Sequence, residues 1–351
     1  MNWFTLFELI TTVLLVIYVV WHFWFLVGKL KSAKLITGIV IVIALALCQI
    51  NLLFFGILVN AVICLIVVDI IRVILMLLKH QELINKLSVI ALVISFILSG
   101  YGIYNVDRTI VTYYDVTIDK KFTDKTLMVV SDIHLGTAID QNDLAKIETN
   151  ASKIVPDAII LLGDIYDENT SQEQFDDSLK VFERLASNYF VCYLEGNHEV
   201  GFQGGNPLEE FDIADKMEKI GVQVLFDKQI MLDDIYLIGR LDYSDEKRTP
   251  LKKLTSGLDL NRPLILLDHQ PQDYQESKKE GIDLQVSGHS HAGQIFPLQY
   301  LYELIRANDL NYGMISDGSF HAVVTSGMGA WGFPMRTAQH SEIVVLNLIS
   351  K

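Results

Sequence analysis

Long hydrophobic runs fill the first third of the chain. Residues 9–27 form one apolar run, 35–78 form a second that is interrupted near Gln49–Asn51, and 87–104 form a third. A bilayer core takes about 20 apolar residues of helix. The second run is long enough for two spans joined by a tight turn. The pattern therefore predicts an all-α transmembrane region within residues 1–108, with four helices at about 9–27, 35–53, 56–78 and 87–104.

From about residue 109 the pattern changes to short apolar segments that alternate with amphipathic stretches. Strands are predicted at 111–118, 126–131, 158–162, 190–194, 222–226, 235–239, 264–267, 284–286, 322–325 and 342–348. Helices are predicted at 142–154, 172–186 and 207–220, the last with Pro207 at its start and Gly221 just past its end. This alternation is typical of a layered α/β domain, which we place at residues 109–351.

Charge divides the chain in the same way. The net charge is −14, and residues 1–108 carry +3, which leaves −17 for the remainder. A strongly acidic domain repels phosphate backbones, so nucleic acid is not an expected partner. Small phosphorylated molecules remain compatible with this charge, because bound divalent cations would offset it locally. The sequence does not indicate an oligomeric state.

Basic residues in the links between the apolar runs predict the orientation. Lys29, Lys31 and Lys34 follow the first run, and Lys79 and Lys86 precede the last one. Such links are cytoplasmic in most membrane proteins. A multi-pass protein of the cell membrane is then expected, with the N-terminus and the domain after residue 104 outside the cytoplasm. A cytoplasmic domain is the alternative.

Polar blocks follow five of the predicted strands. They are Asp132-Ile133-His134, Gly163-Asp164, Gly196-Asn197-His198-Glu199, Asp268-His269 and Gly288-His289-Ser290-His291. Ligand sites in layered α/β sheets form beyond the carboxyl ends of the strands, so these blocks are expected to meet at one edge. Each block alone also has an ordinary explanation: Asp164 as a helix cap, Asn197 as a turn residue, His269 as a core histidine. Their joint placement favours a shared site.

The residue types of these blocks point to metal chemistry. Carboxylate, amide and imidazole ligands in this number suit two first-row divalent ions joined by a bridging ligand, with Mn, Fe or Zn favoured over Mg. Cys48, Cys64 and Cys192 show no Cys-x-x-Cys spacing, so a structural zinc or redox site is not indicated. Two ions about 4 Å apart can share a water, lower its pKa and direct hydroxide at phosphorus.

The order of the blocks resembles the calcineurin-like metallophosphoesterases. The similarity covers roughly residues 125–348. The stretches Gly288–Pro297 and Gly329–Arg336 resemble the bacterial YkuE/YaeI-type branch and its multi-pass relatives, the transmembrane proteins with a metallophosphoesterase domain. The resemblance implies a β-sandwich flanked by helices, which would follow the transmembrane region. It is specific for fold and reaction type and not for the substrate.

The resemblance also implies a role for each residue. Asp132, His134 and His291 would hold one ion, Asp164 would bridge, and Asn197, His269 and His289 would complete the second site. His198 would protonate the leaving oxygen or stabilise the transition state. Ala292 stands where this branch has Gly, and Glu199 replaces the commoner Asp. Neither is a ligand position, so activity is still expected.

The function predicted from this pattern is a membrane-anchored hydrolase of a phosphomonoester, phosphodiester or pyrophosphate bond in a lipid-linked or envelope molecule. Arg336 is a candidate contact for the phosphate or headgroup. The apolar stretches 300–305 and 314–315, in the insertion after the last block, are compatible with a lipid tail, the bilayer surface or ordinary packing. The alternative function is a non-catalytic receptor or scaffold that keeps the fold and its metal.

Overall fold

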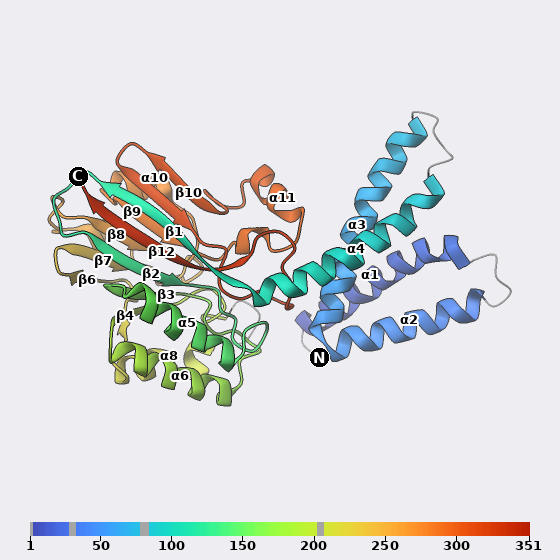
Figure 1. Cartoon of the computed structure of the whole chain (residues 1–351), viewed down its shortest axis with the longest axis horizontal. Coiled ribbons are helices and arrows are strands. Elements are labelled where there is room, and N and C mark those ends of the chain that lie inside the picture. The colour runs from blue at the N-terminus through green and yellow to red at the C-terminus, as the bar shows by residue number, and fades with distance from the viewer. Residues whose placement is uncertain (1–2, 28–32, 78–83, 202–206) are drawn as a thin grey trace. The chain divides into compact units, whose positions relative to one another are not determined.

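A computed structural model describes residues 3–27, 33–77, 84–201 and 207–351 of the chain (Figure 1). The helices are α1 Trp3–Val27, α2 Ala33–Ile50, α3 Leu52–Leu77, α4 Ile84–Asp107, α5 Gln141–Ile154, α6 Gln172–Ala186, α7 Pro207–Glu210, α8 Ile213–Lys219, α9 Leu251–Thr255, α10 Tyr274–Lys279 and α11 Leu298–Ile305, with a 3₁₀ turn η2 at His291–Gly293. The strands are β1 Thr109–Ile118, β2 Lys125–Val130, β3 Ala158–Leu162, β4 Phe190–Leu194, β5 Gln223–Val224, β6 Lys228–Leu232, β7 Ile235–Gly239, β8 Leu264–Leu267, β9 Leu284–Ser287, β10 Gly313–Asp317, β11 Phe320–Val324 and β12 Ser341–Ser350.

The N-terminal region is all-α, as predicted. In its described residues α1 to α4 cover the four predicted segments, and α2 and α3 meet at Asn51, where the turn was expected. By length and composition, two of the helical segments described are able to cross a membrane: Leu52–Leu77 and Leu87–Asp107. The apolar parts described for α1 and α2 are shorter, Ile10–His22 and Ile36–Cys48. Lys29, Lys31 and Lys79, on which the predicted orientation depends, lie outside the described residues.

A polar cluster joins α1, α3 and α4 inside this region. The Asp69 carboxylate accepts hydrogen bonds from the Tyr18 hydroxyl at 2.7 Å and from Arg72 at 2.8 Å. The His22 ring lies 3.1 Å from both Asp69 and the Ser88 hydroxyl. Polar groups in an apolar region are costly unless they pair. This mutual pairing explains how apolar helices accommodate charged residues and holds the three helices together.

Two six-stranded sheets form the core of the second region within the described residues. The strand orders are β1-β12-β2-β3-β4-β5 and β10-β11-β9-β8-β7-β6. Strands β2 to β5 run parallel, as do β7, β8, β9 and β11. Parallel neighbours place the carboxyl ends of β2, β3 and β4 at one edge of their sheet. The ends of β8 and β9 share an edge of the other sheet in the same way.

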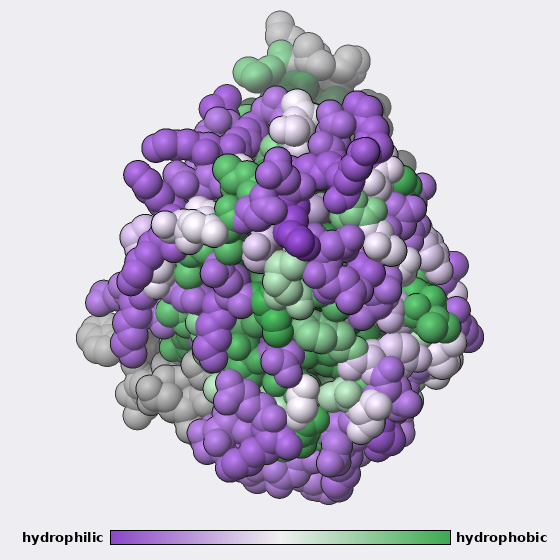
Figure 2. All heavy atoms as spheres, turned by 90° about the vertical axis from the view of Figure 1, so that its left-hand side faces the viewer, coloured by the Kyte–Doolittle hydropathy of each residue, from purple (hydrophilic) through white to green (hydrophobic). Residues whose placement is uncertain are grey.

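Apolar side chains pack in three layers around these sheets. Between the sheets lie residues such as Ile160, Leu194 and Leu267. The outer face of the first sheet packs on α5, α6 and α8, and that of the second on α9 and α10. The predicted β-sandwich flanked by helices is therefore confirmed. Figure 2 shows a face of the molecule covered mostly by hydrophilic residues, with hydrophobic ones visible between them near its middle.

One helix prediction is wrong. The segment 207–220 forms two short helices, α7 and α8, because Asp212 between them adopts a left-handed backbone with φ of 54°. A continuous helix cannot pass through that conformation. The sequence pattern also did not indicate the strands β6 and β10 or the helices α9, α10 and α11.

The chain divides into two compact units, which are described separately. The first comprises Met1–Tyr104 together with Gly332–Thr337, and the second comprises Asn105–Trp331 and Ala338–Lys351. Six residues near the C-terminal end of the chain therefore pack with the N-terminal helices. The backbone N–H of Arg336 donates to the Gly102 carbonyl at 3.0 Å, and the Phe333 ring contacts the Phe55 ring edge to face.

Candidate metal centre

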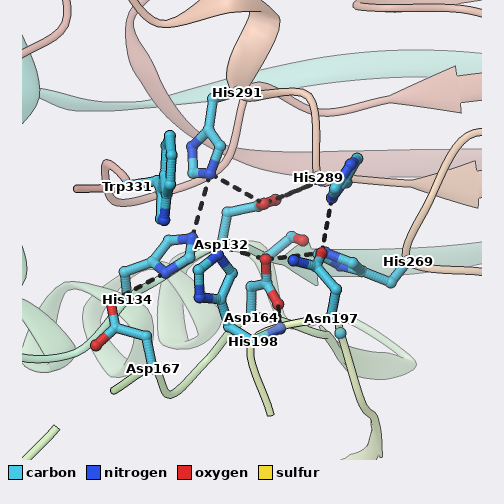
Figure 3. A network of polar contacts seen from close by, with 12 residues as sticks. Asp132, His134, Asp164, Asp167, Asn197, His198, His269, His289, His291 and Trp331 are labelled. Carbon is cyan, nitrogen blue, oxygen red and sulfur yellow. Dashed lines mark hydrogen bonds and ion pairs between the residues drawn. The ribbon is translucent and has the colours of Figure 1, made fainter. Parts of the chain in front are cut away.

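The seven predicted ligands come together at the strand ends of the second unit (Figure 3). Five of them have a left-handed backbone: Asp132, His134, Asp164, His289 and His291, with φ between 47° and 67°. This conformation costs free energy for residues other than glycine, and such strain concentrates at functional sites. The strand ends therefore turn sharply and direct these side chains toward a common point.

The first group of side chains comes from the ends of β2 and β9. Asp132, His134 and His291 offer one carboxylate oxygen and two ring nitrogens that all lie within 4.8 Å of one another. The Nε2 atoms of His134 and His291 are 3.2 Å apart, and the His291 Nε2 is 3.5 Å from Asp132. All three residues are buried.

The second group is centred on Asp164, at the end of β3. Asp164, His269 and His289 form another set within 4.8 Å, with the His269 Nε2 at 3.1 Å from the Asp164 carboxylate. The side-chain oxygen of Asn197 lies 2.8 Å from the Nδ1 of His289. The Asp164 carboxylate also lies 3.7 Å from the Nε2 of His134, which belongs to the first group. Asp164 thus lies between the two groups, where a bridging ligand is required.

His198 also lies at the cluster, where it forms a third set of potential ligand atoms within 4.8 Å together with His134 and Asp164. Its backbone N–H donates to Asp164 at 2.9 Å, and its ring packs edge-on against the His134 ring with 4.8 Å between the centroids. Burial opposes protonation of the imidazole, but the carboxylates of Asp164 and Glu168 outweigh it and raise the pKa of His198 to about 9. These two carboxylates therefore favour the protonated form of the ring.

Backbone groups beneath the cluster are tied to Glu199. Its buried carboxylate accepts hydrogen bonds from the N–H groups of Gly196, Asp164 and Ile165 at 2.7 to 2.9 Å. These bonds join the turn after β3 to the turn after β4. The longer acid at this position, where the related branch has Asp, thus fixes the loops that carry Asp164 and Asn197.

Two glycines leave room that the cluster requires. A Cβ at Gly196 would lie 2.3 Å from the Asp164 carboxylate, and one at Gly288 would lie 2.3 Å from that of Asp132. Real Cβ atoms do not approach other atoms so closely. These positions therefore allow the strand ends to pass directly over the carboxylates.

The sequence analysis missed two neighbours of His198. The Glu168 carboxylate lies 2.9 Å from its Nδ1, and the Trp331 ring lies 6.0 Å from its ring. Trp331 stands in the stretch 329–336 that marks the related branch, which was a usable signal. No periodicity distinguished Glu168 from its neighbour Asp167, which contacts His134 Nδ1 at 3.2 Å instead.

Arg336 does not join the cluster. It belongs to the compact unit of the N-terminal helices, and its side chain is fully buried there. Its guanidinium is thus not available to solvent, and a contact with substrate stays a prediction.

The residues present fit a divalent metal site. Imidazole nitrogens face each other and face carboxylates in a buried cluster: the Nε2 atoms of His134 and His291 are 3.2 Å apart, and the His269 Nε2 lies 3.1 Å from Asp164. Mixed oxygen and nitrogen ligands without thiolates suit exchangeable first-row ions. The groups around Asp132 and around Asp164 each offer three ligand atoms to an ion.

Comparisons with known proteins agree with this geometry. Residues 125–293 match the family model of the calcineurin-like phosphoesterases. An uncharacterised metallophosphoesterase of Campylobacter jejuni is 31% identical over 77% of this chain and 71% of its own length. One from Helicobacter pylori is 31% identical over 67% of this chain, and the alignment spans 63% of that relative. A transmembrane protein with metallophosphoesterase domain from Danio rerio is 27% identical over 75% of this chain and 62% of its own length.

The α/β sandwich and its histidine–carboxylate cluster define a metallophosphoesterase fold. The chain belongs to the calcineurin-like metallophosphoesterase family. Membership in this family supports the assignment of the chain to the metal-dependent phosphoester hydrolases. Relatives named transmembrane proteins, together with two apolar helices, suggest that the chain associates with a membrane.

Proposed function

We propose that this protein is a binuclear metallophosphoesterase of the cell membrane that hydrolyses a phosphomonoester, phosphodiester or pyrophosphate bond in a lipid-linked or envelope molecule. The observation that carries the proposal is the position of Asp164 between two groups of three potential ligand atoms. In such a site, divalent cations activate water and neutralise the charge of the phosphoryl group.

Each side chain then has a distinct task. Asp132, His134 and His291 hold one cation; Asn197, His269 and His289 hold the other; Asp164 joins the two. His198 donates a proton to the leaving oxygen or a hydrogen bond to the phosphoryl group, because its ring lies against the His134 ring and its backbone is bonded to Asp164. Glu168 at 2.9 Å orients that ring.

The proposed location follows from the helices and the distribution of charge. Multi-pass insertion of residues 1–108 with the phosphoesterase domain of residues 109–351 outside the cytoplasm agrees with the basic links of the sequence and with the names of the transmembrane relatives. A tethered enzyme stays within reach of lipid-linked substrates, which favours that substrate class.

The Asp164→Asn variant tests the proposed chemistry. An amide cannot bridge two cations as a carboxylate does, so Mn-dependent hydrolysis of bis-p-nitrophenyl phosphate or p-nitrophenyl phosphate by the full chain should fall by on the order of 10²-fold or more. Asp215→Asn is the matched control, because Asp215 lies in an exposed ion pair with Lys219, and it should keep full activity. Activity that survives in Asp164→Asn would refute the mechanism.

A non-catalytic receptor or scaffold remains the alternative function. It predicts bound metal but no turnover on any phosphoester, whereas the proposed enzyme shows both. The presence of His198 together with all seven ligands at one place favours the enzyme, because a scaffold does not require a proton donor there.

A further inference from the structure

The apolar side chains of helix α11, in the second unit, are largely exposed. None of the eight residues of α11 is buried in the described structure. Its large apolar side chains are exposed: Tyr300 is 59% exposed, Leu301 47%, Leu304 80% and Ile305 61%. Soluble surfaces rarely gather so many large apolar groups on one short element. Something outside this unit is therefore expected to cover α11.

The helix is attached directly to the candidate metal centre. It follows the 3₁₀ turn η2, which begins at the candidate ligand His291. Gly293 in that turn packs against α11 so closely that a Cβ there would lie 2.5 Å from the Cα of Gln299. The start of α11 thus packs against the turn that carries the candidate ligand His291.

The same turn is bonded to both ends of the segment 332–337. Gln294 accepts a hydrogen bond from the Trp331 N–H at 3.0 Å and donates to the Trp331 carbonyl at 2.9 Å. The Ala338 N–H donates to the Gln294 carbonyl at 3.1 Å. Between these two points the chain enters the compact unit of the apolar helices. The segment 332–337 thus leaves the second unit and returns to it at residues that are bonded to the turn before α11.

A second short connection joins the second unit to the apolar helices. Helix α4 ends at Asp107 and β1 begins at Thr109, so a single residue separates a candidate membrane span from the first strand of the sandwich. The candidate span and the first strand of the sandwich are therefore almost continuous in the chain.

We propose that α11 is an interfacial helix that lies on the bilayer surface next to the metal centre, with Leu301, Leu304 and Ile305 among the acyl chains. This inference rests on the proposed function and narrows its substrate class to phosphoesters held in the bilayer. Such substrates would reach the metal centre along α11. Amphipathic helices with aromatic and leucine side chains bind at this depth of the interface. Arg306, directly after the helix, is placed to contact lipid phosphates.

A lipid surface suits α11 better than a protein partner does. Eight helical residues span about 12 Å, and a stable protein interface needs roughly 800 Å² from each partner. The exposed apolar residues of one such helix provide only part of that area. A bilayer has no such minimum, and the two short connections already hold the second unit to the membrane-spanning segments.

Photo-crosslinking in the full chain tests the inference. The photoreactive residue p-benzoylphenylalanine replaces Leu304 or, in a second variant, Leu301, and the protein is reconstituted in phosphatidylcholine nanodiscs. Val155 is the matched control position, because it is 69% exposed at the end of α5 and should face water. Irradiation should give phospholipid adducts at 304 and 301 and none at 155, as detected by mass spectrometry.

The possible outcomes separate this inference from the proposed function. Absence of lipid adducts at both 304 and 301, equal adducts at 155, or adducts to a second protein chain would overturn the interfacial role. Hydrolysis of bis-p-nitrophenyl phosphate, a soluble substrate, is measured on the same preparations and should equal that of the unsubstituted chain. If the unsubstituted chain does not hydrolyse this substrate, the proposed enzymatic function is refuted. The lipid-adduct result would still test the interfacial role of α11.

Discussion

At the scale of single residues, a buried ion pair supports the candidate ligand His269. The preceding residue, Asp268, is buried, and its carboxylate receives two hydrogen bonds from the Arg248 guanidinium, at 2.9 and 2.5 Å. Burial raises the pKa of Asp268, although Arg248 opposes that shift. Arg248 also donates to the Leu241 carbonyl, so it links the loop after β7 to the end of β8.

The variant Arg248→Met should destabilise the protein. It leaves the Asp268 carboxylate buried without its bidentate partner, which costs about 3 kcal/mol of the free energy of unfolding. Lys180→Met removes an exposed pair with Asp177 and should leave that free energy nearly unchanged. Thermal unfolding of the full chain measures both. A similar decrease in Tm for the two variants would show that burial of the Arg248 pair does not matter.

Residue types predicted the candidate ligands better than they predicted the residues around them. The blocks at Asp132, Asp164 and His289 were recognisable because His, Asp and Gly recur at strand ends. Glu168 was not, because its contact with His198 depends on the path of the loop after β3. A carboxylate on a polar loop has no sequence signal that separates a partner of His198 from a solvated side chain.

At the scale of elements, the segment 332–337 packs on α3 and α4. A Cβ at Gly102 would lie 2.5 Å from Met335, and one at Gly56 would lie 2.7 Å from the Phe333 ring. These glycines therefore let the segment approach the two helices closely. By contrast, a Cβ at the exposed Gly100, on the same helix as Gly102, would meet nothing within 4 Å.

Gly102→Leu and Gly100→Leu form a matched pair that tests this packing. Both add the same side chain to α4. The change at Gly102 displaces Met335 and Thr337 and should lower the free energy of unfolding by about 1–3 kcal/mol, whereas the change at Gly100 should be nearly neutral. Thermal unfolding in detergent and limited proteolysis after Trp331 report the difference. Equal behaviour of the two variants would rule out close packing at Gly102.

Elements with strong periodicity were predicted well. The strands β3, β4, β7 and β8 and the helix α6 have the predicted bounds, because continuous apolar runs or an amphipathic repeat set them. The predicted helix at 207–220 failed at Asp212, whose backbone conformation the apolar spacing does not reveal. Helix α11 was not predicted as a helix; its eight residues make only about two turns, and none of them is buried.

At the scale of the whole molecule, the main prediction is that the candidate metal centre lies outside the cytoplasm. An alkaline phosphatase fused after Lys351 should be active in a bacterial host, and a green fluorescent protein at the same position should not fluoresce, because both reporters depend on the compartment. The opposite result would place the candidate centre in the cytoplasm. It would leave the Asp164→Asn test unchanged.

The sequence alone determined the all-α character of the first third, the α/β alternation that follows and the seven candidate ligands. These features depend on local periodicity and on residue chemistry, both of which can be read along a chain. Only the tertiary structure placed Asp164 between two ligand groups, brought Trp331 and Glu168 to His198, and assigned 332–337 to the helices. These arrangements join residues far apart in the chain, and packing between elements fixes them.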